Sequence, residues 1–430
     1  MKKMNFTLPA LALLAAPVAF GAVSDEDFEQ LRRQLAAVSE RLDELAAENA
    51  ELKRSQAQTA SVVADVQTSV TEVKDSGSAG SWPERVSLDG DFRYRFEAID
   101  VQGSPSRERN RIRARVNTRA DVADNLEVGF GLATGDGDPV STNQTLGGGG
   151  SSKSAVINLA YADWEPVDGL HLLAGKFDNP NVSAGKQPLL FDSDFTPEGL
   201  GISYQREWFF ANAIGTFLES DTRSNNKNFS WGGQVGATVQ LANVELLGGL
   251  GYYSMDTRGK STNFGDPTDP GDFFGNTAVE PGGLPCGTTP GVNCVYLYDY
   301  LLTQAFAEAS FDIAGMPAAV FADYIENSDA PDDNTGWTVG ARIGQTKDRG
   351  DLQFGYYYAD KGADSLLGLV TDSDFAGGGT DNKGHFLQLG YGVSKSWSIG
   401  VQYFINEVDV ASGVNSDYNR LMLDTQWKWK

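Results

Sequence analysis

Arginine occupies nearly every second position in the stretch RERNRIRARVNTRA, residues 107–120. One face of this stretch carries small or apolar side chains, at Ile112, Ala114, Val116 and Ala120. The other face carries polar side chains, at Arg109, Arg111, Arg113, Arg115, Asn117 and Arg119. Because successive side chains of a strand point to opposite faces, the stretch predicts a β-strand. One face of this strand meets apolar surroundings and the other meets polar surroundings.

The same alternation continues on both sides of this stretch. In the preceding segment the apolar face consists of Val86, Leu88, Phe92, Tyr94 and Phe96, and the polar face of Asp89, Asp91, Arg93, Arg95 and Glu97. Similar segments recur as far as the C-terminus, where the last one contains Leu421, Leu423, Trp427 and Trp429. Strands of about ten residues predict a total of about sixteen over residues 84–430.

The connections between these segments alternate in length. Short ones such as Ala242-Asn243 separate long ones such as 178–198 and 256–297. Short turns at one end and long loops at the other are typical of a bacterial outer-membrane barrel. Lipid offers no hydrogen-bond partner, so every strand edge there must be paired by closure. We therefore predict an all-β fold, a transmembrane antiparallel β-barrel. The alternative, a soluble β-sandwich or β-helix, explains neither the alternating loops nor the outward-facing aromatic residues.

Aromatic residues near the predicted strand ends support a membrane location. Trp and Tyr are enriched at both interfaces of a bilayer, where they form girdles around barrels. The expected girdle residues are Trp164, Trp208, Tyr252, Trp397, Trp427 and Trp429.

The N-terminus has the pattern of an export signal. Lys2 and Lys3 precede an apolar stretch from Leu8 to Phe20, and small residues follow it. This pattern predicts a signal peptide over residues 1–22, which places the mature chain outside the bacterial cytoplasm. A buried N-terminal helix is the alternative.

A heptad repeat follows the signal. Apolar residues recur at spacings of four and three from Phe28 to Val73, with Asn49 at an a position. Such a seam predicts an α-helical coiled coil over residues 23–75, on the periplasmic side, and Asn at an a position is a device for fixing register. The Ser- and Gly-rich residues 76–83 then form a linker. A single amphipathic helix packed on a globular core is the alternative.

Composition excludes several classes of function. The chain has 430 residues, 49 of them Gly, and a formal net charge of −24. An acidic chain does not bind nucleic acid by bulk electrostatics. Two Cys and two His leave little room for a disulfide scaffold, a zinc site or a catalytic triad, and His171 and His385 stand isolated. We expect no enzyme activity, no cofactor and no metal site.

The polar faces of the first two strands predict a pore wall. Arginine is always charged, and its fork suits anions. We expect a basic wall in the lumen, made by Arg93, Arg95, Arg111, Arg113, Arg115 and Arg119. The long loop after the fifth strand is acidic, and we expect it to fold inward as a constriction with Asp178, Asp192, Asp194 and Glu198. The alternative is structural: Asp89, Asp91, Glu97 and Asp121 neutralise the arginines in a packed interior.

Two smaller features belong to other long loops. Cys286 and Cys294 are separated by seven residues, and an exported chain favours a local disulfide between them. The pairs Asp136/Asp138 and Asp372/Asp374 offer too few oxygens for a calcium site, and we interpret them as solvated loop charge.

Several stretches resemble a family of bacterial putative porins. They include RERNRIRAR at 107–115, AYADW at 160–164, AGKFDNP at 174–180 and FDSDFTPEG at 191–199. The resemblance also covers 132–135 and 138–146, and it is looser towards the C-terminus. It implies a trimeric channel with periplasmic coiled coils. The chain departs from many outer-membrane barrels by ending in Trp429-Lys430 rather than in an aromatic residue.

These observations favour passive diffusion of small hydrophilic solutes and ions through an outer-membrane channel. An anion- or phosphate-selective porin is the first alternative, and an envelope tether that links the outer membrane to the cell wall through the coiled coil is the second. The expected partners are outer-membrane lipid, two further copies in a homotrimer, and peptidoglycan or another periplasmic partner. No nucleic acid is expected.

Overall fold

The computed structural model describes residues 53, 85–187, 189–221, 227–413 and 415–430. Apart from Lys53, the predicted signal peptide (1–22), coiled coil (23–75) and linker (76–83) lie outside the described residues. The chain divides into two units, Met1–Ser81 and Trp82–Lys430, and the following description concerns the second.

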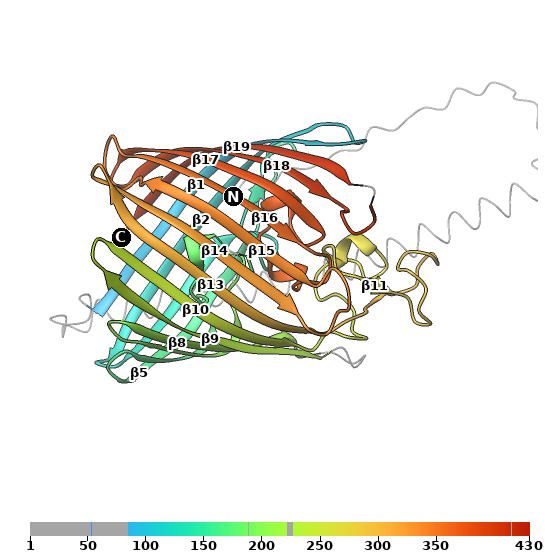
Figure 1. Cartoon of the computed structure of the whole chain (residues 1–430), viewed down its shortest axis with the longest axis horizontal. Helices are drawn as coiled ribbons and strands as arrows, with labels where there is room; N and C mark the ends of the chain where they lie inside the picture. Colours follow the sequence, from blue (N-terminus) through green and yellow to red (C-terminus); the bar gives the residue numbers. More distant parts are fainter. Residues whose placement is uncertain (1–52, 54–84, 188, 222–226, 414) are drawn as a thin grey trace, which may run out of the picture. The chain divides into compact units, whose positions relative to one another are not determined.

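In the described part of the chain, sixteen strands form one closed antiparallel barrel, as the sequence predicts (Figure 1). They are β1 (Val86–Val101), β2 (Arg107–Ala123), β3 (Leu126–Thr134), β5 (Ala155–Val167), β6 (Leu170–Lys176), β7 (Glu198–Gln205), β8 (Phe209–Glu219), β9 (Asn228–Leu241), β10 (Val244–Met255), β13 (Tyr300–Ile313), β14 (Met316–Asn327), β15 (Thr335–Gly344), β16 (Leu352–Lys361), β17 (Asn382–Ser394), β18 (Trp397–Val408) and β19 (Ser416–Trp429). Strand β1 pairs with both β2 and β19, which closes the sheet. Closure leaves no unpaired edge, as a lipid environment requires.

Shorter elements lie in the long loops. Strand β4 (Gln144–Thr145) pairs with β2, and β11 (Ala278–Val279) pairs with β12 (Val295–Tyr296) at the loop end of the barrel (Figure 1). The 3-10 turns are η2 (Ala184–Lys186), η3 (Pro270–Phe273), η4 (Gly368–Val370) and η5 (Phe375–Gly377). Pairs of two residues are too short to produce a periodic signal, so the sequence does not predict them. No described helix combines the length and the apolar character needed to cross a bilayer.

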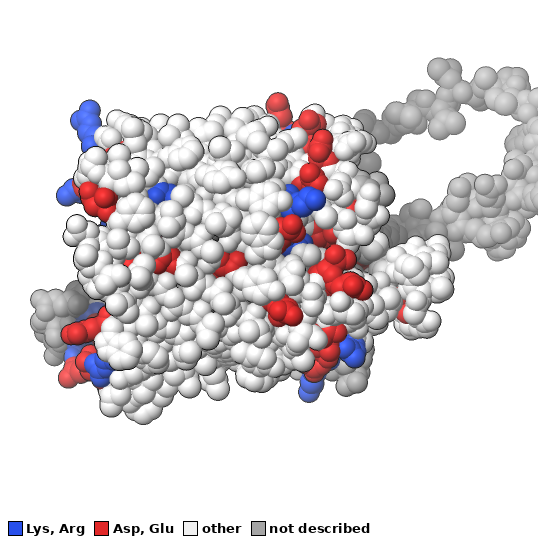
Figure 2. Space-filling view, in the orientation of Figure 1, with Lys and Arg blue, Asp and Glu red and all other residues white. Residues whose placement is uncertain are grey.

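The outer wall of the barrel is apolar. Every second side chain of the strands points outward, and large apolar residues such as Leu200 (67% exposed) and Leu250 (61%) are mostly exposed. Figure 2 shows that charged residues gather mainly towards the two ends of the barrel, with a largely uncharged belt between them. Such a belt matches the hydrocarbon core of a membrane.

The lumen is partly filled by loops. Loops 177–197, 256–299 and 362–381 contribute to one apolar cluster with lumen-facing side chains; its members include Leu189, Leu190, Phe195, Phe273, Tyr296, Leu366 and Val370. A second cluster contains aromatic residues from strands between β8 and β18, among them Phe210, Phe306, Phe321, Tyr357, Phe386 and Phe404. The charged lumen residues described next lie mainly on β1, β2 and β19, at the seam where the barrel closes.

Candidate functional site

Eight arginines line the lumen side of this seam, and we call them the arginine wall. They are Arg93 and Arg95 on β1, Arg109, Arg111, Arg113, Arg115 and Arg119 on β2, and Arg420 on β19. The strand register places Arg93 directly across from Arg113, and Arg95 across from Arg111. Like charges directly opposite each other are unfavourable in a sheet, so the wall requires carboxylates nearby.

Acidic residues of the same strands supply part of this neutralisation. Asp91 accepts hydrogen bonds from Arg113 (3.0 Å) and from Arg115 (2.6 Å). Glu97 is fully buried and contacts Arg420 at 2.9 Å, Arg109 at closer range and Arg111 at 3.5 Å. Asp89 pairs with Arg119. Of the four acids expected to neutralise the arginines, Asp89, Asp91 and Glu97 therefore do contact the wall. The arginines line the lumen and are also paired within a packed interior, so the functional and the structural interpretation overlap.

Loop 177–197 brings a further carboxylate to the wall. Asp194 lies 3.0 Å from an Nη1 of Arg115 and 3.4 Å from that of Arg113. Asp192 instead stabilises the loop. Its oxygens accept hydrogen bonds from the backbone N–H groups of Asp194 (2.7 Å) and Ser373 (2.8 Å). Burial, together with the Asp372 and Asp194 carboxylates, raises the pKa of Asp192 well above its ordinary value. The loop thus lies inside the barrel and touches the basic wall.

The other two predicted loop acids have different places. Asp178 lines a cavity next to Arg115. Glu198 is the first residue of β7 rather than part of the loop, and it pairs at 2.8 Å with Lys176, its neighbour on β6. Its side chain is 60% exposed and away from the arginine wall. The strand begins one residue earlier than the sequence suggests, which is why Glu198 does not join Asp194.

The tip of loop 177–197 is anchored on another part of the barrel wall. The N–H of Val182 donates to Oε1 of Gln234 on β9 (2.5 Å), and the N–H of Gly185 donates to Oε2 of Glu308 on β13 (2.7 Å). Gly185 has φ +67°, and a Cβ there would lie 2.4 Å from the ring of Phe321. Only glycine fits this tip. The loop therefore runs from the arginine wall to strands on a different side of the lumen.

A second loop, 362–381, also reaches the wall, and the sequence interpretation missed it. Asp374 accepts hydrogen bonds from Arg95 (2.8 Å) and Arg420 (3.0 Å). Burial by itself raises the pKa of Asp374, but Arg95 and Arg420 outweigh it and the net shift is strongly downward. Interpreting Asp372 and Asp374 as solvated charge was wrong, because the loop folds inward and Asp374 joins the wall's ion pairs. The contacts of η5 with β17, β18 and β19 and the hydrogen bond from Ser373 to Asp192 help to hold it there, and nothing local in the sequence signals these contacts.

A polar cavity of about 500 Å³ opens near the wall at the end of the barrel with the short turns. Its lining includes Asp89, Asp91, Arg115, Asn117 and Asp178, together with the turn and C-terminal residues Lys395, Ser396, Lys428 and Lys430. Several wall side chains stay in contact with solvent, including Arg115 (26%) and Arg119 (32%). The charged wall is therefore accessible to water from this end.

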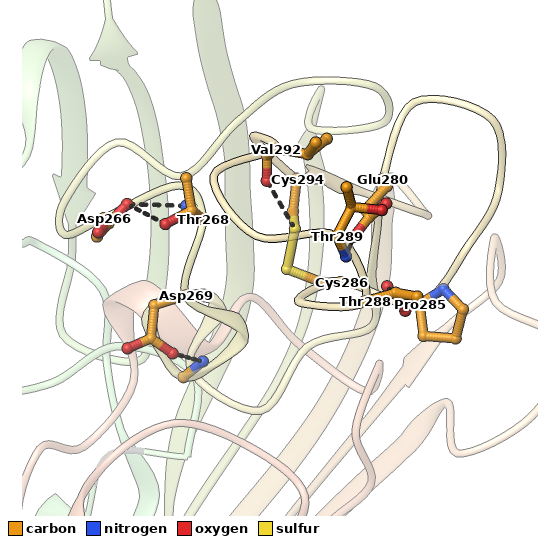
Figure 3. Close-up of a disulfide and its surroundings, with 11 residues drawn as sticks. Asp266, Thr268, Asp269, Glu280, Pro285, Cys286, Thr288, Thr289, Val292 and Cys294 are labelled. Carbon is orange, nitrogen blue, oxygen red and sulfur yellow. Dashed lines mark hydrogen bonds between the residues drawn. A yellow bond between two sulfur atoms is a disulfide. The ribbon is translucent and has the colours of Figure 1, made fainter.

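The two cysteines lie in the longest loop. Cys286 and Cys294 form a disulfide, with β12 beginning directly after Cys294 (Figure 3). Around it, the N–H of Cys294 donates to the carbonyl of Pro267 (2.7 Å), and the N–H of Thr289 donates to Glu280 (2.5 Å). Cys294 is completely buried in the loop cluster. The disulfide thus staples a loop that packs over the lumen.

Both histidines lie outside the wall. His171 Nδ1 lies 3.0 Å from Asp163, and His385 Nδ1 lies 3.0 Å from the hydroxyl of Tyr356. Within the described ranges no group of three or more His, Cys, Asp or Glu side chains is placed to hold a metal ion.

Comparisons with known proteins agree with this architecture. The model of the Putative porin family matches residues 101–280 and 296–428. Among curated proteins, none matches this sequence.

Solved structures of bacterial outer-membrane proteins are similar to the chain. OprB of Pseudomonas putida at high pH is 11% identical, with a TM-score of 0.52 over 81% of this chain and 95% of that one. OmpF of Salmonella typhi in complex with daunomycin is 12% identical (TM-score 0.47; 81% and 99%). OmpT of Vibrio cholerae, folded in vitro and in its trimer form, is 13% identical (TM-score 0.46; 80% and 99%). The likeness to OprB concerns the fold.

The family match covers well over half of the chain, and the closed sixteen-stranded barrel has an apolar outside and a charged lumen. The family and the fold are those of a channel rather than of an enzyme. The chain belongs to the Putative porin family and is a porin of the bacterial outer membrane.

Proposed function

We propose that the channel lets small hydrophilic solutes and ions diffuse passively past the arginine wall. The observation that carries this proposal is an ion pair between Asp194 of loop 177–197 and Arg115 of the arginine wall. Arg115 also lines a polar cavity that is open to water. Opposed charges held at a narrow point act on any solute that passes. Arg93, Arg95, Arg111, Arg113, Arg115 and Arg119 are the proposed pore-lining residues, with Asp178, Asp192 and Asp194 on the constriction loop.

Swelling of proteoliposomes tests this proposal. Purified full-length protein is reconstituted into lipid vesicles, which are diluted into isotonic solutions of an uncharged monosaccharide or an uncharged trisaccharide. We expect rapid swelling in the monosaccharide and much slower swelling in the trisaccharide, because the loops narrow the lumen. Vesicles with heat-denatured protein are the control. Vesicles that swell in neither sugar, despite verified insertion, contradict a diffusion channel.

Anion or phosphate selectivity remains the alternative, since the arginine wall favours it. The formal net charge of −24 opposes it. One measurement separates the general diffusion channel from the anion-selective porin. It is the reversal potential in a salt gradient, whose sign shows whether the anion or the cation crosses more easily.

The remaining proposals concern the rest of the chain and its assembly. We propose a signal peptide over 1–22, a periplasmic coiled coil over 23–75 and a linker over 76–83, and an assembly of three copies embedded in outer-membrane lipid. A link from the coiled coil to peptidoglycan or another periplasmic partner, and the absence of catalytic activity, belong to the same proposal. Deleting residues 24–80 separates the roles: a tether loses envelope integrity, whereas a channel keeps conducting.

A further inference from the structure

Arg93 differs from the other members of the arginine wall in its partners. Seven of the eight arginines have a carboxylate oxygen within 4.0 Å, namely Arg95, Arg109, Arg111, Arg113, Arg115, Arg119 and Arg420. Within the described part of the chain, Arg93 has none. Its hydrogen bond runs from Nη2 to the neutral side-chain oxygen of Asn143, at 2.7 Å.

The residues that face Arg93 directly on the two neighbouring strands carry no negative charge either. Across the sheet it faces Arg113 on β2 and Gln426 on β19. The carboxylates that lie further off, Asp374 and Asp424, are already held by Arg95. A guanidinium that stays charged at this position is costly unless an anion accompanies it.

Unused hydrogen-bond donors are found on three described guanidiniums of the wall. The buried Nε atoms of Arg93, Arg111 and Arg420 have no hydrogen-bond partner. Of these three, Arg420 is held closely by Glu97 and Asp374, at 2.9 and 3.0 Å, whereas Arg93 and Arg111 have no carboxylate that near. Arg93 and Arg111 converge on Asn143: Arg93 contacts its side-chain oxygen, and Arg111 lies 3.5 Å from its backbone carbonyl. The other contacts of Arg111, to Glu97 and Ser141, are also long, at 3.5 Å. Buried donors without protein partners call for an explanation such as an ordered water or a bound ion.

We propose that Arg93 and Arg111, positioned by Asn143, form an anion-binding site in the lumen that takes the carboxylate of a small organic acid during its passage. The planar fork of each guanidinium suits a carboxylate. The surrounding carboxylates Glu97, Asp374 and Asp424 repel a second negative charge, so the site favours a monoanion over a phosphate dianion. This inference rests on the proposed function, because it names a step on the diffusion path.

The test uses purified full-length protein in planar lipid bilayers with potassium acetate as the electrolyte. For the wild type we expect the conductance to saturate as the acetate concentration rises, which is the sign of a binding site. Arg93→Gln should give a conductance that rises linearly and an acetate-to-potassium permeability ratio at least about threefold lower, an effect of the size expected for one charge near a surface. Arg93→Lys should restore part of the permeability ratio but not the saturation, because lysine keeps the charge without the fork.

Two further variants control for charge and for folding. Arg85→Gln removes the same charge from an exposed pair with Asp124, and it should leave both readouts unchanged. Asn143→Ala keeps both arginines but removes the hydrogen-bond acceptor of Arg93. The saturation of the conductance should therefore weaken, with little change in the permeability ratio. If Arg93→Gln does not insert into the bilayer, Asn143→Ala alone tests the site. Saturation and reversal potential that are the same in the wild type, Arg93→Gln and Asn143→Ala overturn the site. A wild type without any conductance refutes the diffusion channel instead.

Discussion

Arg95 and Asp424 form a two-pronged ion pair across the seam that closes the barrel. Nε and Nη2 of Arg95 donate to the two oxygens of Asp424 at 2.7 and 2.8 Å, and the two residues are direct register partners on β1 and β19. Arg95 is 1% exposed. The first and the last strand of the barrel are therefore joined by a buried, bidentate pair as well as by backbone hydrogen bonds.

Breaking this pair should destabilise the barrel. Asp424→Asn leaves the buried Arg95 with Asp374 as its strongest partner, and removing one member of a buried pair costs about 3 kcal/mol. We expect the urea midpoint of unfolding from lipid vesicles to fall accordingly. Asp124→Asn is the matched control, because its pair with Arg85 is exposed and should contribute less than about 1 kcal/mol. Equal effects of the two variants contradict a role for the seam pair.

Asp194→Asn should shift ion selectivity towards anions. The carboxylate is the loop's contact with Arg113 and Arg115, and its removal leaves both guanidiniums with a smaller share of negative charge. The chloride-to-potassium permeability ratio, obtained from the reversal potential in a potassium chloride gradient, should rise about threefold. Asp168→Asn, in an exposed pair with Arg206 on a short turn, is the control and should change nothing. An unchanged reversal potential for Asp194→Asn removes this residue from the selectivity filter.

Glu308→Ala should loosen loop 177–197. Glu308 accepts the N–H of Gly185 and pairs with Arg342, so it anchors the loop tip on β13. Losing a hydrogen bond to a charged group costs about 2 kcal/mol. We expect larger current fluctuations in single channels and a higher mean conductance. Glu326→Ala, which contacts Tyr324 at the outer face, provides the comparison. Quiet wild-type-like currents in Glu308→Ala contradict the anchoring role.

Acidification should make the channel more anion-selective before ordinary carboxyls titrate. Burial, with the neighbouring carboxylates Asp372 and Asp194, raises the pKa of Asp192, and burial with Asp374 raises the pKa of Asp372. Their charge is therefore lost at a higher pH than that of an ordinary Asp, while Asp374 stays ionised because Arg95 and Arg420 lower its pKa. Reversal potentials across a pH series should show this early shift, and Asp192→Asn should reduce it. A shift confined to the range of ordinary carboxyls contradicts the assignment.

The same raised pKa values affect loop stability in a defined direction. A group whose pKa is higher in the folded than in the unfolded chain stabilises the fold at low pH, and this contribution is lost as the pH rises through the folded pKa. Loops 177–197 and 362–381, which Asp192 joins through the N–H of Ser373, are therefore expected to hold together better in mild acid than at high pH.

The barrel and its lumen wall could be predicted because both depend on local alternation. In the stretch 107–115 each arginine stands two residues from the next, and that spacing alone puts Arg111, Arg113 and Arg115 on one face. The strand count follows from the same rule applied along the chain. Alternation cannot show which two strands pair to close the barrel.

The missing parts of the site are contacts between distant segments. Arg420 and Asp424 join the wall only because β19 pairs with β1, more than 320 residues away in sequence. Asp374 and Asn143 reach it through loops that have no periodic pattern. Glu198 was misplaced because a strand boundary cannot be located to one residue from sequence, and one residue decides whether a side chain belongs to the loop or to the strand.

The central claim is a water-filled passage beside the arginine wall, and single-channel recording tests it most directly. Purified full-length protein in planar bilayers with potassium chloride should produce stepwise current increments that are proportional to voltage. Membranes that stay electrically silent at high protein load, with insertion verified independently, contradict it.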